Sequence, residues 1–174
     1  MPTSSSTGPE ETTEPETSWV PTTSSGTNEE TEGAAGAGLT WRRFDRDDSL
    51  GVDLVGCGYS DGANECDPYS GDTPCSEARS VLCILKTDEP NPGVMVDGYM
   101  QWSGGHIDVT IPVQGDSFAS VGEADTFCEQ SFGAGWRMAE FHDGQMWYFW
   151  AYGNVPEGER FWVWINDQPS GNCW

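Results

Sequence analysis

Six cysteines constrain the fold of this chain more than any other feature of its sequence. They lie in the last two thirds of the chain, at Cys57, Cys66, Cys75, Cys83, Cys128 and Cys173. No C-x-x-C pair occurs, and the first four cysteines are spaced more widely than zinc-knuckle ligands. An even number of cysteines without metal-ligand spacing favours disulfides, which form in exported proteins rather than in a reducing cytosol. We therefore expect a disulfide-bonded protein that is secreted or anchored at the cell surface.

The first four cysteines border two predicted strands. Residues 52–57 and 80–85 are rich in Val, Leu and Ile, and the segment between them has the composition of turns. We expect a disulfide-rich hairpin over about residues 50–90. The four cysteines allow three pairings, and the sequence does not choose among them. The pairing that would join strand to strand and pin the loop is the nested one, Cys57 with Cys83 and Cys66 with Cys75.

Residues 1–38 have the composition of a disordered stalk. Thr, Ser, Glu, Pro and Gly dominate, and Trp19 and Val20 are the only bulky apolar residues after Met1. Such a segment buries too little apolar surface to offset its backbone entropy. Acidic tracts of this kind serve as stalks, or simply as flexible leaders. The segment resembles the spacer that follows the lipidated cysteine of bacterial surface lipoproteins, which implies a lipid anchor on the native N-terminus.

The chain is strongly acidic, with 29 Asp and Glu, 7 Lys and Arg, and a net charge of −22. Nucleic acids and anionic membrane surfaces are bound through Lys and Arg, so we exclude both as partners. The sequence has neither an apolar run long enough to span a membrane nor a signal peptide at its start. We expect an export signal ahead of these residues and no direct membrane insertion. The acidity serves solubility or attracts cations and basic partners.

The other predicted elements are one helix and two strands. Residues 120–132 predict the helix, because Ser120 and Glu123 match a capping box and glycines follow the last apolar residue. Residues 94–102 and 106–113 predict the strands. In the second strand, alternate apolar residues share one face: Ile107, Val109, Ile111 and Val113.

The last third of the chain carries a recognisable pattern. The helix bears Cys128, a Gly-containing turn follows it, and an aromatic hairpin ends with Cys173 one residue before the C-terminus. The apolar residues after the Gly turn are Trp136, Met138 and Ala139. The segment from Ala124 to Trp174 resembles the core of a C-type lectin-like domain, and it is distantly similar to sulfatase-modifying domains.

This resemblance implies an α+β, C-type lectin-like fold that is stapled by disulfides and has mainly antiparallel strands and one clear helix. It also implies a disulfide between Cys128 and Cys173, which would close the two ends of the domain together. We expect the folded domain to occupy residues 39–174. Domains of this kind are usually binding modules, so the resemblance implies recognition of a partner rather than catalysis.

Two places in the sequence offer oxygen ligands for calcium, and the sequence requires no other cofactor. The run from Trp164 to Asp167 is similar to the W-N-D signature of calcium-dependent lectins, which implies that Asn166 and Asp167 hold the ion. A hydrogen-bonded turn is the alternative, since the partner motif E-P-N or Q-P-D does not follow the helix. The second place is the acidic loop, whose oxygen-bearing side chains do not have EF-hand spacing: Asp61, Asn64, Asp67 and Asp72.

Aromatic residues are dense between residues 146 and 164. We expect the terminal hairpin to expose some of them as a surface for sugar rings or a protein partner. The expected ligand-binding residues are Trp147, Trp150, Trp162 and Trp164. The alternative is that these side chains form the core of a small domain.

Glu140, His142 and Asp143 are the candidates for catalysis. They place two carboxylates and an imidazole within four residues, but no recognisable nucleophile lies nearby. We interpret His142 and Asp143 as a polar turn that closes onto Gly144. The sequence therefore predicts a surface binding module for a glycan or a protein. A subunit of a self-associating extracellular filament and an enzyme are the alternatives.

Overall fold

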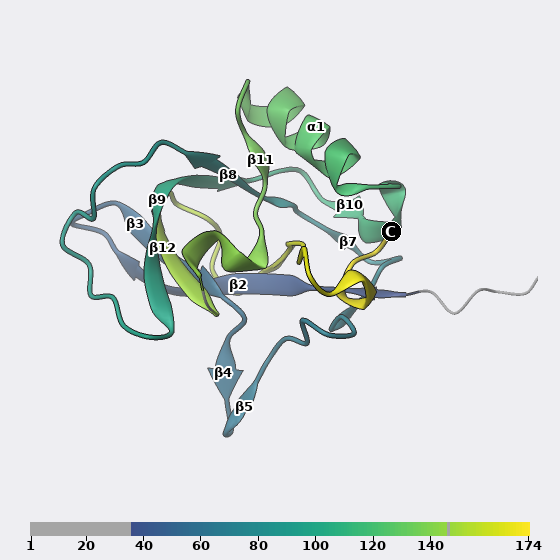
Figure 1. Ribbon diagram of the computed structural model, residues 1–174, viewed down its shortest axis with the longest axis horizontal. Coiled ribbons are helices and arrows are strands. Elements are labelled where there is room, and N and C mark those ends of the chain that lie inside the picture. Colours follow the sequence, from purple (N-terminus) through teal and green to yellow (C-terminus); the bar gives the residue numbers. More distant parts are fainter. Residues whose placement is uncertain (1–35, 146) are drawn as a thin grey trace, which may run out of the picture. The chain divides into compact units, whose positions relative to one another are not determined.

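The fold is organised around a long, twisted sheet (Figure 1). Most neighbouring strands in this sheet are not consecutive along the chain. The computed structural model describes residues 36–145 and 147–174. In sheet order, the seven strands found in these residues are β11 (Arg137–Met138), β8 (Leu82–Lys86), β9 (Met100–Val109), β12 (Tyr148–Tyr152), β3 (Val52–Gly56), β2 (Thr40–Asp47) and β13 (Arg160–Trp162). Neighbouring strands are antiparallel except for the parallel pair β9 and β12.

Shorter elements surround this sheet. The two-stranded pairs are β1 (Ala37–Gly38) with β6 (Thr73–Pro74), β4 (Tyr59–Ser60) with β5 (Ala63–Asn64), and β7 (Ala78–Arg79) with β10 (Val113–Gln114). The helical elements in the described part are α1 (Val121–Phe132) and the 3₁₀ turns η1 (Gly115–Ser117), η2 (Phe141–Gly144) and η3 (Pro169–Gly171). The predicted α+β class with mainly antiparallel strands is thus confirmed. Within the described residues, none of the helices is long and apolar enough to span a membrane.

The start of the folded region differs slightly from the expected boundary. β1 contains Ala37 and Gly38, which the sequence assigned to the end of the stalk. Gly38 is buried, and β1 pairs with β6, which directly precedes Cys75. Residues 1–35 of the predicted stalk lie outside the described residues, and Gly36 is exposed.

Aromatic packing holds the centre of the sheet. The ring of Trp41 on β2 is fully buried and lies 5.6 Å from the ring of Phe141 and 5.5 Å from that of Phe149. The strands predicted at residues 52–57 and 80–85 are confirmed as β3 and β8, whose apolar side chains join the core. Their runs of Val, Leu and Ile are buried because each strand lies between two neighbours in the sheet.

The strands predicted at residues 94–102 and 106–113 are wrong in their boundaries. A single strand, β9, runs from Met100 to Val109. The predicted apolar face stops there, because the Thr110 hydroxyl accepts a hydrogen bond from the Val81 amide at 3.0 Å. Ile111, expected on the apolar face, is 73% exposed.

The predicted helix is confirmed as α1, but its N-terminus differs in detail. The Ser120 side chain makes no capping hydrogen bond. The Glu123 carboxylate instead accepts a hydrogen bond from the Ala119 amide at 2.8 Å. Ala124 and Cys128 form the buried face of the helix, which packs beside β11 (Figure 1).

All six cysteines form disulfides, but with different partners from those expected. The bonds are Cys57–Cys66, Cys75–Cys173 and Cys83–Cys128. The nested pairing and the Cys128–Cys173 bond are therefore both wrong. The reason is the order of the sheet. α1 packs against β11, whose sheet neighbour β8 carries Cys83, so the helical cysteine meets Cys83.

The C-terminus instead lies beside the first strand. The amide of Leu39 donates to the carbonyl of Gly171 at 2.8 Å, and this contact places Cys173 next to the loop of Cys75. The expected terminal hairpin is also absent from the described residues, because β3 and β2 separate β12 from β13 in the sheet.

Candidate binding site

Burial decides which of the four predicted tryptophans can meet a ligand. Trp162 is 2% exposed and its indole Nε1 donates to the Val113 carbonyl at 3.0 Å, while Trp150 is 9% exposed. Both side chains lie in strands covered by neighbouring elements and present little surface to a ligand. Trp164 is half-buried and packs against the cluster around Met138. Trp147 is half-buried and borders a cavity.

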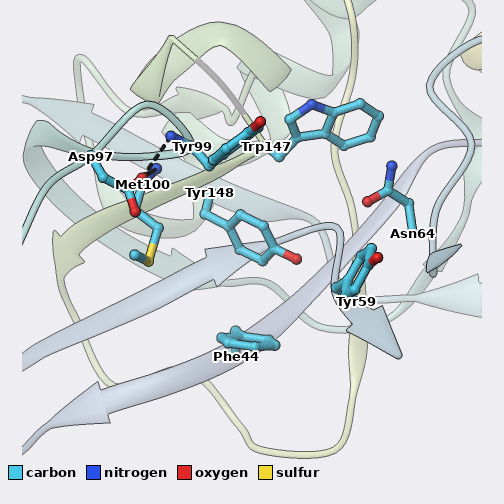
Figure 2. Close-up of a pocket in the computed structure, with 8 residues that line it drawn as sticks. All are labelled: Phe44, Tyr59, Asn64, Asp97, Tyr99, Met100, Trp147 and Tyr148. Carbon is cyan, nitrogen blue, oxygen red and sulfur yellow. Dashed lines mark hydrogen bonds between the residues drawn. The ribbon is translucent and has the colours of Figure 1, made fainter. Parts of the chain in front are cut away.

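That cavity is an open, largely aromatic groove of about 510 Å³, which we call the aromatic groove (Figure 2). Its lining residues come from four separate segments: Phe44, Tyr59, Asn64, Asp97, Tyr99, Met100, Trp147 and Tyr148. Three of the rings are unusually exposed for their size, with 47% for Phe44, 55% for Tyr59 and 63% for Tyr99. Exposed aromatic side chains gathered around one depression are typical of a binding surface.

A β-bulge supplies the floor of the groove. The register between β2 and β3 shifts between Arg43 and Asp45, which leaves Phe44 as the extra residue. A bulge of this kind redirects a side chain out of the regular alternation of a strand. The Phe44 ring meets the ring of Tyr148 edge to face, with 5.3 Å between their centres.

A glycine on β3 makes room for Tyr148. Gly56 pairs with Tyr148 across β3 and β12, and a Cβ atom at this position would collide with the Trp147 carbonyl and with the Tyr148 ring. Because Gly56 has no side chain, the phenol ring can cross β3 toward Phe44. In Figure 2 its hydroxyl points toward the side of the groove formed by Tyr59 and Asn64.

The β4–β5 hairpin forms this side of the groove. Its turn, Asp61–Gly62, has positive φ angles of 50° and 84°, as expected for a two-residue hairpin turn. Tyr59 pairs with Asn64, so both of the hairpin's groove residues sit at the same register position. The Cys57–Cys66 disulfide closes the base of the hairpin.

A partly buried ion pair fastens the same hairpin to the sheet. The Glu65 carboxylate lies 2.7 Å from Arg42 Nε on β2 and 3.6 Å from Arg160 on β13. Burial acts to raise the pKa of Glu65, but hydrogen bonds from Ser60 and Arg42 outweigh it and lower the pKa below its ordinary value. The Arg42 guanidinium, paired with Glu65, also lies 5.8 Å from the centre of the Phe44 ring.

The opposite side is a turn at the start of β9. One oxygen of Asp97, Oδ1, accepts hydrogen bonds from the amides of Tyr99 at 2.6 Å and Met100 at 2.8 Å (Figure 2). These bonds fix the turn and the exposed Tyr99 ring, and they leave Oδ2 of Asp97 without a contact in this network. The groove thus combines five aromatic rings, three of which are phenols, with a carboxylate and an amide. Its eight lining residues include no Lys or Arg.

The three residues that were the alternative candidates for catalysis, Glu140, His142 and Asp143, lie at one 3₁₀ turn. Glu140 and Asp143 cap η2 reciprocally: the Glu140 carboxylate accepts the His142 amide at 2.7 Å, and Asp143 accepts the Glu140 amide at 2.7 Å. Asp143 also pairs with Arg137, and Glu140 accepts the Asn166 amide at 3.2 Å. The interpretation of this segment as a polar turn is confirmed. Every oxygen of the two carboxylates has a hydrogen-bond donor.

The oxygen ligands suggested for calcium are spread over several places. Asn166 and Asp167 lie in an exposed bend. Asp67 accepts hydrogen bonds from Tyr69 and Ser70, and Asp72 accepts from Thr40, while Asp61 and Asn64 belong to the β4–β5 hairpin. Among the described residues, no group of three or more His, Cys, Asp or Glu side chains is placed to hold a metal ion.

Most of the groove was not identified from the sequence. Trp147 was singled out, whereas Phe44, Tyr59, Tyr99 and Tyr148 were not. The turn signal Asp61–Gly62 next to an aromatic residue was the one local clue to Tyr59.

Comparisons with protein-family models, with curated proteins and with solved structures found nothing that matches this chain.

Proposed function

We propose that this domain is an extracellular binding module that holds a glycan without negative charge in the aromatic groove. The observation that carries the proposal is the gathering of exposed aromatic rings around one open depression. The C–H faces of sugar rings pack on aromatic faces, and hydroxyl groups need nearby polar partners. Asn64, Asp97 Oδ2 and the Tyr148 hydroxyl provide such partners at the edges of the rings.

Charge supports this class of ligand over acidic glycans. The groove carries the Asp97 carboxylate but no cationic side chain, and the chain has a net charge of −22. Uronic or sialic acid units would be repelled, because desolvating like charges without a counter-ion is unfavourable. Neutral sugars and amino sugars meet no such penalty.

The extracellular location and the lectin-like assignment belong to the same proposal. Disulfides that use every cysteine support an oxidising compartment. The resemblance to C-type lectin-like domains is supported by the helix, the Gly turn and the strand after it. Its expected Cys128–Cys173 bond does not form, so the proposed binding rests on the groove and not on that resemblance.

We propose binding rather than catalysis for a local reason. The carboxylates of Glu140 and Asp143 are occupied by backbone amides and by Arg137, which makes them fixed parts of η2. The groove itself contains no nucleophile next to a base among its lining residues.

A glycan array with the purified domain, run with and without calcium, tests the proposal. Neutral or amino-sugar glycans should be retained in both conditions, and sialylated or uronic glycans should not. Tyr59→Ala should abolish the signal, since truncating a central aromatic contact costs about tenfold or more in affinity. Ile111→Ala, which shortens an exposed side chain outside the groove, should leave it unchanged. Retention that survives Tyr59→Ala and Phe44→Ala alike would reject the groove as the binding site.

A further inference from the structure

A second, smaller cavity lies next to the aromatic groove. Its volume is about 190 Å³, and it is lined by Pro68, Tyr69, Phe141, His142, Trp147, Ile165, Asp167 and Gln168. Trp147 lines both cavities and so lies at the boundary between them. We call this depression the second cavity.

Aromatic packing holds Trp147 in place. The rings of Trp147 and Phe141 meet edge to face with 5.2 Å between their centres, and those of Phe141 and His142 with 5.1 Å. Phe141 is buried and also contacts the core residue Trp41. Trp147 and His142 therefore rest on a single fixed ring.

The second cavity offers the same kinds of groups as the first. Tyr69 is 65% exposed, and its backbone is fixed because its amide donates to Asp67 at 2.8 Å. His142 Nδ1 lies 2.8 Å from the Glu140 carboxylate, which only accepts hydrogen bonds when ionised. Nδ1 faces this carboxylate, and Nε2 is the ring atom left for a ligand. Asp167 and Gln168 add a carboxylate and an amide.

Size argues against a separate ligand for the second cavity. Pockets that bury a whole small molecule usually measure about 300–1,000 Å³. The aromatic groove falls in this range at about 510 Å³, whereas the second cavity at about 190 Å³ does not. The second cavity has room for one ring-sized part of a ligand that is held elsewhere.

We propose that the two cavities form one extended site, in which neighbouring rings of a single oligosaccharide lie on either side of Trp147. This inference rests on the proposed glycan binding of the aromatic groove. Tyr69 and His142 then determine how the site discriminates between short and long chains, and they contact the part of the ligand that extends beyond the groove.

Titration calorimetry with two homologous series tests the proposal: the oligomers of β-1,4-linked glucose and of β-1,4-linked N-acetylglucosamine, from monosaccharide to hexasaccharide. In the series that binds, affinity should rise by roughly tenfold, or ~1.4 kcal/mol, once the chain can pass Trp147. Tyr69→Ala and His142→Ala should remove this increment and leave the affinity of the shortest binding oligomer unchanged. Tyr59→Ala should weaken short and long oligomers equally.

The outcomes separate the two proposals. If short oligomers bind but longer ones gain nothing, or if Tyr69→Ala keeps the full increment, the extended site is wrong and glycan binding by the groove stands. If neither series nor any arrayed glycan binds, both proposals fail. Tyr69 is exposed, so its variant should fold even if loss of the His142–Glu140 hydrogen bond disturbs η2 in His142→Ala.

Discussion

Phe44 and Tyr148 meet edge to face at 5.3 Å, although a bulge in β2 supplies one ring and the start of β12 supplies the other. A side chain at Gly56 would collide with the Tyr148 ring, and the bulge in β2 gives Phe44 its position. The contact therefore defines the floor of the aromatic groove.

Phe44→Ala should lower glycan affinity by about tenfold, because it removes an aromatic ring that the proposed ligand would contact. The melting temperature should change little, since the ring is half-exposed. Phe44→Tyr should keep both affinity and stability. Calorimetric titration and thermal unfolding measure the two quantities. Unchanged affinity in Phe44→Ala would show that the ligand does not lie on this ring.

Gly56→Ala should destabilise the domain and distort the groove together. The new methyl group would meet the Trp147 carbonyl and the Tyr148 ring, and overpacking of this kind costs about 1–3 kcal/mol. Gly98→Ala is the matched control, because a Cβ there meets nothing within 4 Å and its φ is not positive. Urea unfolding of the two variants gives the comparison. Equal stability would mean that β12 can move away from β3 at little cost.

The Cys57–Cys66 disulfide should matter more for binding than for folding. It closes a short loop with a sequence separation of 9, and so contributes less than the ~3 kcal/mol expected of a 15-residue loop. The other restraint on the β4–β5 hairpin described above is the Glu65–Arg42 ion pair, and isolated two-stranded hairpins are marginally stable. The double variant Cys57→Ser/Cys66→Ser should stay folded but show fast amide exchange in the hairpin and weaker glycan binding.

The control for that prediction is Cys83→Ser/Cys128→Ser. This bond has a sequence separation of 45 and links α1 to β8, so its loss should cost more stability, about 4 kcal/mol, without a specific effect on the hairpin. If the folded Cys57→Ser/Cys66→Ser variant kept full glycan affinity, the disulfide would not be what positions the β4–β5 hairpin at the side of the groove.

Acid should release the same hairpin through Glu65. Its folded-state pKa lies below the ordinary value of 4.5, so the ion pair with Arg42 stabilises the fold above that pH. This stabilisation is lost as the pH falls through the lower folded-state pKa. Tyrosine and tryptophan fluorescence, recorded with and without ligand, measures the glycan affinity. The affinity should stay unchanged from neutral pH to about pH 5 and should fall below that pH. Glu65→Gln should bind less tightly at neutral pH and lose much of this acid transition.

Local elements could be predicted from the sequence, but their partners could not. α1, β3 and β8 follow from apolar periodicity and turn residues within short windows. Disulfide pairing depends on which strands are neighbours, and the order that places β12 between β9 and β3 leaves no trace in any one segment. The exposure of Phe44 depends on the bulge in β2. The burial of Trp162 depends on its packing in one cluster with Ala124 and Cys128 of α1. Composition alone could not separate these two aromatic residues into site and core.

The Cys75–Cys173 bond has a mechanical consequence. The Cys75 amide donates to the Gly36 carbonyl at 2.8 Å, β1 pairs with β6 just before Cys75, and the disulfide joins this point to the C-terminal end. A pull applied to the chain at Gly36 would therefore enter the domain at β1, which is hydrogen-bonded to the strand beside the disulfide that holds Cys173. Tension would be borne near that junction in shear between β1 and β6, and the hairpin, the bulge and Trp147 would carry little of the load.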